Sequence, residues 1–150
     1  MGTFSPTDIN RVIKGTTFTT DHKKYSFVKL DRKDYQKLLG LIKPLTSQFV
    51  EIIYDKDELT LIVEEETWKN LSSKITAIKI DDPIARITCE VQEPTVTGYL
   101  LTFLQKLSPA GVSVFVQGAF TTDHIFVYHK DLEKTLKILN DIKTLDITLQ

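Results

Sequence analysis

The residues of this chain that could carry nucleophilic or metal-binding chemistry are few and scattered. Its single cysteine is Cys89, and its three histidines are His22, His124 and His129. A catalytic thiol needs a basic partner that converts it to the thiolate, and no such partner is recognisable for Cys89. The spacing of these four residues is not that of metal ligands. We therefore expect Cys89 to be a small core residue on a strand, and we expect no metal site.

The common motifs of catalysis and cofactor binding are missing as well. The chain has no GxGxxG, P-loop, GxSxG or HExxH pattern. Carboxylates that are far apart in the sequence could still converge in space, so a deep pocket lined by several of them would favour an enzyme. Without such a pocket we expect a non-catalytic protein with no cofactor.

Composition and charge indicate an ordinary globular protein. Of 150 residues, 41% are hydrophobic and 26% are charged, and 19 Lys and Arg against 20 Asp and Glu leave a formal net charge of -1. Neutralising phosphates requires a basic surface, so nucleic acid is not expected as a partner. No apolar stretch approaches the ~18 residues of a membrane span, and residues 1–24 contain no signal-peptide run. We expect a cytosolic α+β protein without a membrane partner.

Hydrophobic periodicity predicts the order strand, helix, strand, strand, helix, strand in the first half of the chain. The predicted elements are a strand at 25–30, a helix carrying Tyr35 to Leu45, strands at 49–54 and 59–63, a short helix at 65–71 and a strand at 75–80. Asp31 is placed to cap the first helix, and Asp55-Lys56-Asp57 forms the turn between the paired strands.

The same order recurs in the second half. Its predicted elements are a strand at 84–91, a helix whose apolar face runs from Val96 to Leu107, strands at 112–116 and 125–128, a helix capped by Asp131 and reaching Ile142, and a strand at 145–149. The chain then consists of an N-terminal extension, 1–24, and two ferredoxin-like βαββαβ units, 25–82 and 83–150. Each unit is expected to be an antiparallel sheet with both helices on one face.

A duplicated pentapeptide does not fit this arrangement. Residues 18–22 and 120–124 both read Phe-Thr-Thr-Asp-His. The first copy precedes the first predicted strand, whereas the second links two strands. A rival repeat, offset by the spacing of the two copies, would leave residues 49–80 without a counterpart. We retain the two-unit arrangement, in which the duplication has no explanation.

Three stretches, in this order, resemble a family of tandem ACT-domain proteins. Residues 49–66, FVEIIYDKDELTLIVEEE, are similar to its paired strands and acidic helix start. Residues 97–114, from Thr97-Gly98 through Ala110-Gly111, resemble its ligand-side helix and the next strand, and residues 120–127 resemble its hairpin. The family includes aspartokinase-like regulatory proteins and the CASTOR-type arginine sensors. The resemblance implies a non-catalytic sensor that holds an amino acid where ACT domains meet.

The resemblance also implies a ligand pocket in the second unit, built from the loop after its first strand, the start of its first helix and its hairpin. By matching position, the pocket residues are Gln92, Glu93, Val96, Thr97, Gly98, Ala119, Phe120, Thr122 and Asp123. Two departures from the family bear on the ligand. Gly118-Ala119 replaces its Ser-Thr and removes two hydroxyl donors, and Asp31-Arg32-Lys33-Asp34 replaces the glycine-opened helix in the first unit. We expect the first unit to be structural.

The chemistry of these positions suits an amino acid. A helix N-terminus offers free N–H groups and a positive dipole end to a carboxylate, and Gly98 would let the ligand approach the backbone. Asp123, assisted by Glu93, could bind an ammonium or a cationic side chain, which favours Lys or Arg as ligand. Each residue also has an ordinary structural explanation: Asp123 as a turn residue, Gly98 as a close helix–sheet contact, Glu93 as part of a loop.

Two functions stay open at this point. In the first, the chain is a cytosolic amino-acid sensor in which binding shifts the arrangement of domains that a protein partner recognises. CASTOR-type sensors have four ACT units and this chain has two, so a homodimer would supply the missing half, with the pocket within one chain or between chains. In the second, the chain is a structural or adaptor module that has lost its ligand, as the departure at Gly118-Ala119 favours.

Overall fold

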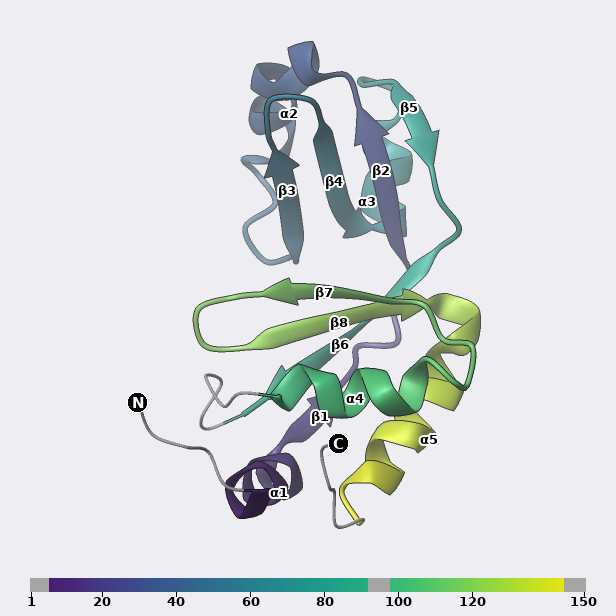
Figure 1. Ribbon diagram of the computed structural model, residues 1–150. Helices are drawn as coiled ribbons and strands as arrows, with labels where there is room; N and C mark the ends of the chain where they lie inside the picture. The colour runs from purple at the N-terminus through teal and green to yellow at the C-terminus, as the bar shows by residue number, and fades with distance from the viewer. Residues whose placement is uncertain (1–5, 92–97, 145–150) are drawn as a thin grey trace. The chain divides into compact units, whose positions relative to one another are not determined.

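The computed structural model describes residues 6–91 and 98–144. The chain divides into two compact units. The first, Lys23–Ile84, is called the continuous unit here, and the second, which combines Met1–His22 with Ala85–Gln150, is called the composite unit. Figure 1 labels the helices and strands of both.

The continuous unit has the element order predicted for the first half of the chain. Its elements are β2 (Tyr25–Leu30), the 3-10 helix η1 (Arg32–Asp34), α2 (Tyr35–Ile42), β3 (Val50–Tyr54), β4 (Leu59–Glu64), α3 (Glu65–Leu71) and β5 (Ala77–Ile80). The strands pair antiparallel in the order β3-β4-β2-β5. This order, with the first strand between the third and the fourth, is that of a ferredoxin-like sheet.

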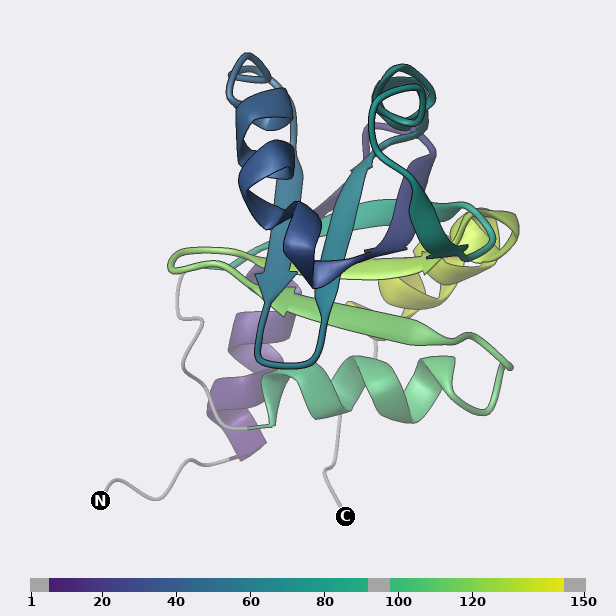
Figure 2. The same ribbon diagram turned by 90° about the horizontal axis from the view of Figure 1, so that it is seen from above.

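Alternate residues of the sheet form the core of the continuous unit. Val28 and Leu30 of β2 are buried with Leu61 of β4, and they pack against Leu38 of α2 and Trp68 of α3. Both helices therefore cover the same face of the sheet (Figure 2). Because strand side chains alternate between faces, the residues between these core positions lie on the opposite side, which we call the helix-free face.

Aspartates at two helix starts behave differently. The Asp31 carboxylate accepts the backbone N–H of Lys33 at 3.0 Å, so it caps η1 and not the longer helix for which it was predicted; the N-cap of α2 is Asp34, whose side chain makes no cap bond. This hydrogen bond lowers the pKa of Asp31. Asp131 also precedes its helix, but its carboxylate makes no cap hydrogen bond and lies 3.0 Å from Nζ of Lys134. The predicted cap at Asp131 is therefore replaced by an ion pair within the helix.

The β3–β4 turn is stabilised by Asp55. Its Oδ1 accepts the backbone N–H groups of Asp57 and Glu58, each at 2.8 Å. These two hydrogen bonds lower the pKa of Asp55. The predicted turn is confirmed, and its physical cause is the tendency of aspartate to bond the backbone two or three residues further on.

The composite unit contains the second predicted set of elements together with an N-terminal helix and strand. Its elements are α1 (Pro6–Gly15), β1 (Thr17–Thr19), β6 (Ile84–Glu90, whose first residue belongs to the continuous unit), α4 (Tyr99–Leu107), β7 (Val114–Gly118), β8 (Asp123–Tyr128), the 3-10 helix η2 (His129–Asp131) and α5 (Leu132–Ile142). Within it the strands follow the order β1-β6-β8-β7. The helices α1, α4 and α5 share one core with β6 and β8 and lie on one side of this sheet (Figure 1).

The N-terminal residues are part of this fold rather than an extension of it. Residues 17–19 of β1 pair antiparallel with residues 88–90 of β6, so β1 lies beside the first strand of the repeat. Ile9 and Ile13 of α1 are buried in the same core. The reason is burial: β6 contributes fully buried side chains, and a strand so deeply buried needs hydrogen-bond partners along both edges. The strand expected at 145–149 lies outside the described residues.

The end of α4 explains why β7 begins later than predicted. Gly111 has φ +72° and donates its N–H to the carbonyl of Ser108 at 2.9 Å. Val112 donates to the carbonyl of Leu107 at 3.1 Å. These two bonds form the glycine-terminated C-cap that is common at helix ends. The N–H of Val112 is thus used by the helix, and regular pairing in β7 starts at Val114.

No helix in the described part of the chain is both long enough and apolar enough to cross a bilayer.

Candidate functional site

The predicted pocket residues divide into two groups. Gln92, Glu93, Val96 and Thr97 lie outside the described residues. The structure describes the remaining five, which belong to the start of α4 and to the β7–β8 hairpin: Gly98, Ala119, Phe120, Thr122 and Asp123.

Gly98 is the N-cap residue of α4 and has a left-handed backbone, with φ +85° and ψ -1°. This conformation is costly for residues with a Cβ, so glycine is required here by the turn itself. The carbonyl of Gly98 accepts both the backbone N–H and the hydroxyl of Thr102, at 3.2 and 3.1 Å. No side chain of the described residues caps the N-terminus of α4, and its first turn contains no acidic residue.

The β7–β8 hairpin presents one aromatic and one acidic side chain. Ala119 donates its N–H to the carbonyl of Thr122 at 2.8 Å and closes the turn. Phe120, at the tip, is 100% exposed, whereas Thr122 and Asp123 are half-buried. A Cβ added at Gly118 would meet Oδ1 of Asp123 at 3.5 Å, an ordinary contact. A Cβ at position 118 would therefore fit beside this carboxylate.

Asp123 has a small electrostatic effect on two buried side chains of the composite unit. The pKa of the Tyr99 hydroxyl is raised mainly by burial, with Asp123 a smaller cause in the same direction. Burial likewise raises the pKa of the Cys89 thiol to about 12, and Asp123 again adds to it. Asp123 is thus near enough to influence the residue that follows Gly98. Both affected groups, the Tyr99 hydroxyl and the Cys89 thiol, belong to buried residues of the composite-unit core.

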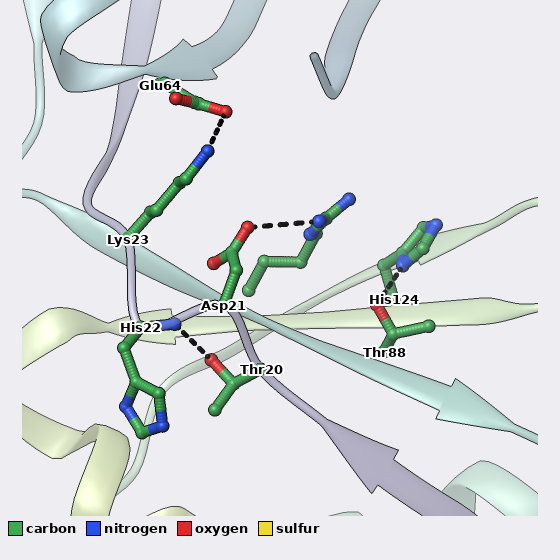
Figure 3. Close-up of polar contacts among 8 residues, drawn as sticks. Thr20, Asp21, His22, Lys23, Glu64, Thr88 and His124 are labelled. Carbon is green, nitrogen blue, oxygen red and sulfur yellow. Dashed lines mark hydrogen bonds and ion pairs between the residues drawn. The ribbon is translucent and has the colours of Figure 1, made fainter. Parts of the chain in front are cut away.

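Polar contacts also surround β6 on both sides (Figure 3). Asp21 lies 3.1 Å from the guanidinium of Arg86, and Thr88 Oγ1 lies 3.2 Å from Nδ1 of His124. Asp21 belongs to the first copy of the pentapeptide and His124 to the second. Because β1 and β8 both pair with β6, the duplicated segments lie beside the same strand.

The phenylalanines of the two pentapeptide copies differ in burial. Phe18 packs edge-on against Phe103, with ring centroids 5.3 Å apart, while Phe120 is fully exposed. His22, the last residue of the first copy, has φ +55°, and its N–H donates to the hydroxyl of Thr20 at 3.2 Å. The repeated sequence therefore forms two different turns.

Metal and thiol chemistry find no support in the described part of the chain. Among the described residues, no group of three or more His, Cys, Asp or Glu side chains could hold a metal ion. Cys89 is buried, and a thiol whose pKa is about 12 is almost wholly protonated at neutral pH. Its position on a buried strand agrees with the predicted core role.

Residues 79–141 match the family model of the ACT domain. The matched segment runs from the end of β5 into α5, so this part of the chain is similar to an ACT domain. A search of curated proteins found no match.

Solved structures share the fold over most of the chain. A Vibrio cholerae protein of unknown function, described as a possible transport protein, is 19% identical, with a TM-score of 0.74 over 91% of this chain and 97% of its own. A protein from Agrobacterium tumefaciens is 24% identical, with a TM-score of 0.61 over 81% and 84%. The regulatory subunit of aspartate kinase from Thermus thermophilus is 11% identical, with a TM-score of 0.59 over 84% and 97%. These likenesses concern the fold.

A pocket outside the predicted site lies in the continuous unit, the half that we expected to be structural. It has a volume of about 270 Å³ and is lined by Phe27, Lys29, Glu58, Thr60, Lys79 and Asp81. Alternation alone places Lys29 on a predicted strand with its side chain away from the core. The pairing of that strand with the one carrying Lys79 is not visible in the sequence, so the pocket was missed.

Proposed function

We propose that the chain is a non-catalytic regulatory protein whose ACT domain binds an amino acid between the start of α4 and the β7–β8 hairpin. The observation that supports this proposal is the match of residues 79–141 to the ACT-domain model, because this segment contains both Gly98 at the start of α4 and Asp123 on the β7–β8 hairpin. An α-amino acid has one anionic and one cationic end. The helix start and the aspartate provide one complement for each.

The helix start would bind the carboxylate. Backbone N–H groups in the first turn of a helix lack partners within the helix, and the dipole adds partial positive charge there. No described side chain caps this end of α4. Gly98 would leave room for the carboxylate to reach the backbone, and Thr97 and Val96 would border it.

The hairpin would bind the cationic part of the ligand. Asp123 would pair with an ammonium or guanidinium, and Glu93 and Gln92 would contribute from the loop before α4. Phe120, Thr122 and Ala119 would form the outer wall, where the exposed ring could cover an aliphatic chain. Paired acidic groups favour Arg or Lys over an acidic amino acid.

Signalling would follow from a change in association. In this proposal the two units are a tandem ACT pair that corresponds to half of a CASTOR-type sensor. A second copy of the chain completes a homodimer. A partner protein in the cytosol recognises the liganded form. A ligand can shift such an equilibrium only by its difference in affinity for the two forms. Tighter association in the presence of ligand is the expected sign.

The test is a thermal-shift screen against the twenty amino acids, followed by calorimetry. We expect stabilisation by Arg or Lys, lost in Asp123→Asn and retained in Asp141→Asn, which removes an exposed carboxylate on α5. Gly98→Ala should weaken binding, whereas Gly111→Ala imposes the same left-handed strain at the other end of α4 and should not.

A second function is favoured by the hairpin itself. Gly118 and Ala119 carry no hydroxyl donors, and the fully exposed Phe120 suits a contact with another protein. The chain would then be an adaptor that binds no amino acid. If no amino acid at millimolar concentration shifts the thermal transition, the adaptor function is the one supported. Light scattering tests the dimer, because a mass of 17.1 kDa in solution would contradict it.

A further inference from the structure

The helix-free face of the continuous unit carries two lysines directly opposite each other. In the antiparallel pairing of β2 with β5, Lys29 is the partner of Lys79. Directly opposed residues project to the same face, and like charges in such a pair destabilise the sheet. Both lysines line the pocket of about 270 Å³.

Only one of these lysines is neutralised by the protein. Nζ of Lys29 lies 3.3 Å from Oε2 of Glu58, and the other oxygen of Glu58 accepts the hydroxyl of Thr60 at 3.0 Å. Both oxygens of Glu58 are therefore engaged. The side chain of Lys79 makes no ion pair or hydrogen bond with any residue in the ranges 6–91 and 98–144. The face thus holds an unpaired positive charge beside a paired one.

We propose that this pocket binds a small organic monocarboxylate. One carboxylate oxygen would accept from Lys79 and the other from Lys29, which relieves the repulsion between the two strands. The ring of Phe27 forms an apolar part of the lining, suited to the hydrocarbon part of such a ligand.

Size and charge restrict the ligand further. The pocket is slightly smaller than the ~300–1,000 Å³ typical of small-molecule sites, so the ligand has few atoms beyond its carboxylate. Two lysines and two acidic residues, Glu58 and Asp81, leave the lining without net charge. A dianion would meet repulsion from these acids once the lysines were neutralised. A single carboxylate on a short aliphatic or aromatic body fits best.

This inference does not rest on the proposed amino-acid site. All nine residues of that site lie in the composite unit, whereas all six lining residues of this pocket lie in the continuous unit. Asp123→Asn should therefore leave carboxylate binding intact, and Lys79→Gln should leave the amino-acid response intact.

The test is an NMR titration of the full chain with sodium benzoate and sodium butyrate, against sodium chloride at equal ionic strength. We expect saturable shifts at the amides of Phe27, Thr60 and Lys79 with either carboxylate and none with chloride. Lys79→Gln should weaken binding at least tenfold. Glu58→Gln should strengthen it severalfold, because it leaves Lys29 without its partner. Lys74→Gln removes an exposed lysine outside the pocket and is the matched control.

The outcomes separate cleanly. Equal affinity in Lys79→Gln and in the unsubstituted chain would overturn the proposal, as would shifts that chloride reproduces. If ethylammonium shifts the resonances of these amides and benzoate does not, the pocket binds cations and the proposal is wrong. Weakening in Lys79→Gln with strengthening in Glu58→Gln supports the proposal, since loss of a merely structural ion pair would not tighten binding of an anion.

Discussion

The hydroxyl of Tyr99 donates a hydrogen bond to Oγ1 of Thr16 over 3.2 Å, and both side chains are buried. Thr16 in turn donates to the carbonyl of Val12 at 2.9 Å. This short chain of bonds joins the N-terminal helix to the first residue of α4. The N-terminal segment therefore supports the helix start that the proposed amino-acid site uses.

Removing either end of the Tyr99–Thr16 bond should destabilise the fold unequally. Thr16→Val leaves a buried phenol without its acceptor, which costs about 1–3 kcal/mol, whereas Tyr99→Phe removes the hydroxyl altogether and costs about 1 kcal/mol. Urea unfolding followed by circular dichroism measures both. Thr17→Val, at an exposed position in β1, is the control and should change little. A greater loss in Tyr99→Phe than in Thr16→Val would contradict this account.

Two phenylalanines provide a contrast between core and surface. Phe103 is fully buried and has edge-to-face contacts with Phe18 at 5.3 Å and Tyr99 at 4.8 Å. Phe103→Ala should lower the free energy of unfolding by about 3–5 kcal/mol because it leaves a large cavity. Phe120→Ala should change it by less than about 0.5 kcal/mol, as is usual for exposed positions. Equal losses in the two variants would mean that Phe120 is covered in solution.

His124 should make stability depend on pH. Burial lowers its pKa below 6.5, Arg86 lowers it further, and Asp123 opposes both. As pH falls below 6.5, the unfolded chain therefore takes up the proton first. The stability that the neutral imidazole contributes is complete above 6.5 and is lost as pH falls through the pKa of the folded state.

An NMR titration of the imidazole tests this sign and its causes. Arg86→Gln should raise the pKa of His124, and Asp123→Asn should lower it, because the two charges act in opposite directions. A pKa of His124 above 6.5 in the unsubstituted protein would refute the assignment of burial as the main cause.

Cys89 should react slowly in the folded protein. Burial raises the pKa of its thiol to about 12, so only a minute fraction is the reactive thiolate at pH 8. Labelling of the native chain with an aromatic disulfide reagent should proceed at the rate at which the composite unit opens. The control is the chain unfolded in 6 M guanidinium, where labelling should be rapid. Stoichiometric labelling of the native chain within seconds would show that the thiol is accessible.

Elements whose sequence signals lie within one short segment agree well with their predictions. The helix predicted at 65–71 is α3, because its acidic start and its apolar spacing both lie within the segment. The turn at Asp55 is equally local. By contrast, the helix expected to begin near Val96 begins at Tyr99, because the left-handed backbone of Gly98 interrupts the regular dihedral angles.

In the N-terminal segment, the helix has a signal in the sequence but the strand that follows it does not. Ile9, Val12 and Ile13 have the spacing of an amphipathic helix, which is the buried side of α1. This spacing is a local signal, present in the sequence without any knowledge of the fold. The strand that follows has only three residues, and its partner is about 70 positions away in the sequence, a separation over which periodicity carries no information.

Taken by itself, the sequence determined the βαββαβ order of the first half, the βαββα order of the described part of the second half, the antiparallel class and the ACT resemblance, since each depends on patterns within short stretches. Only the tertiary structure decided which segments lie next to each other. It paired Lys29 with Lys79, placed both copies of the pentapeptide beside β6, and included β1 in the sheet. These pairings arise because strand edges need hydrogen-bond partners and apolar surfaces must be removed from water. Both needs are met by segments far apart in the sequence, so only the folded chain shows which segments meet them.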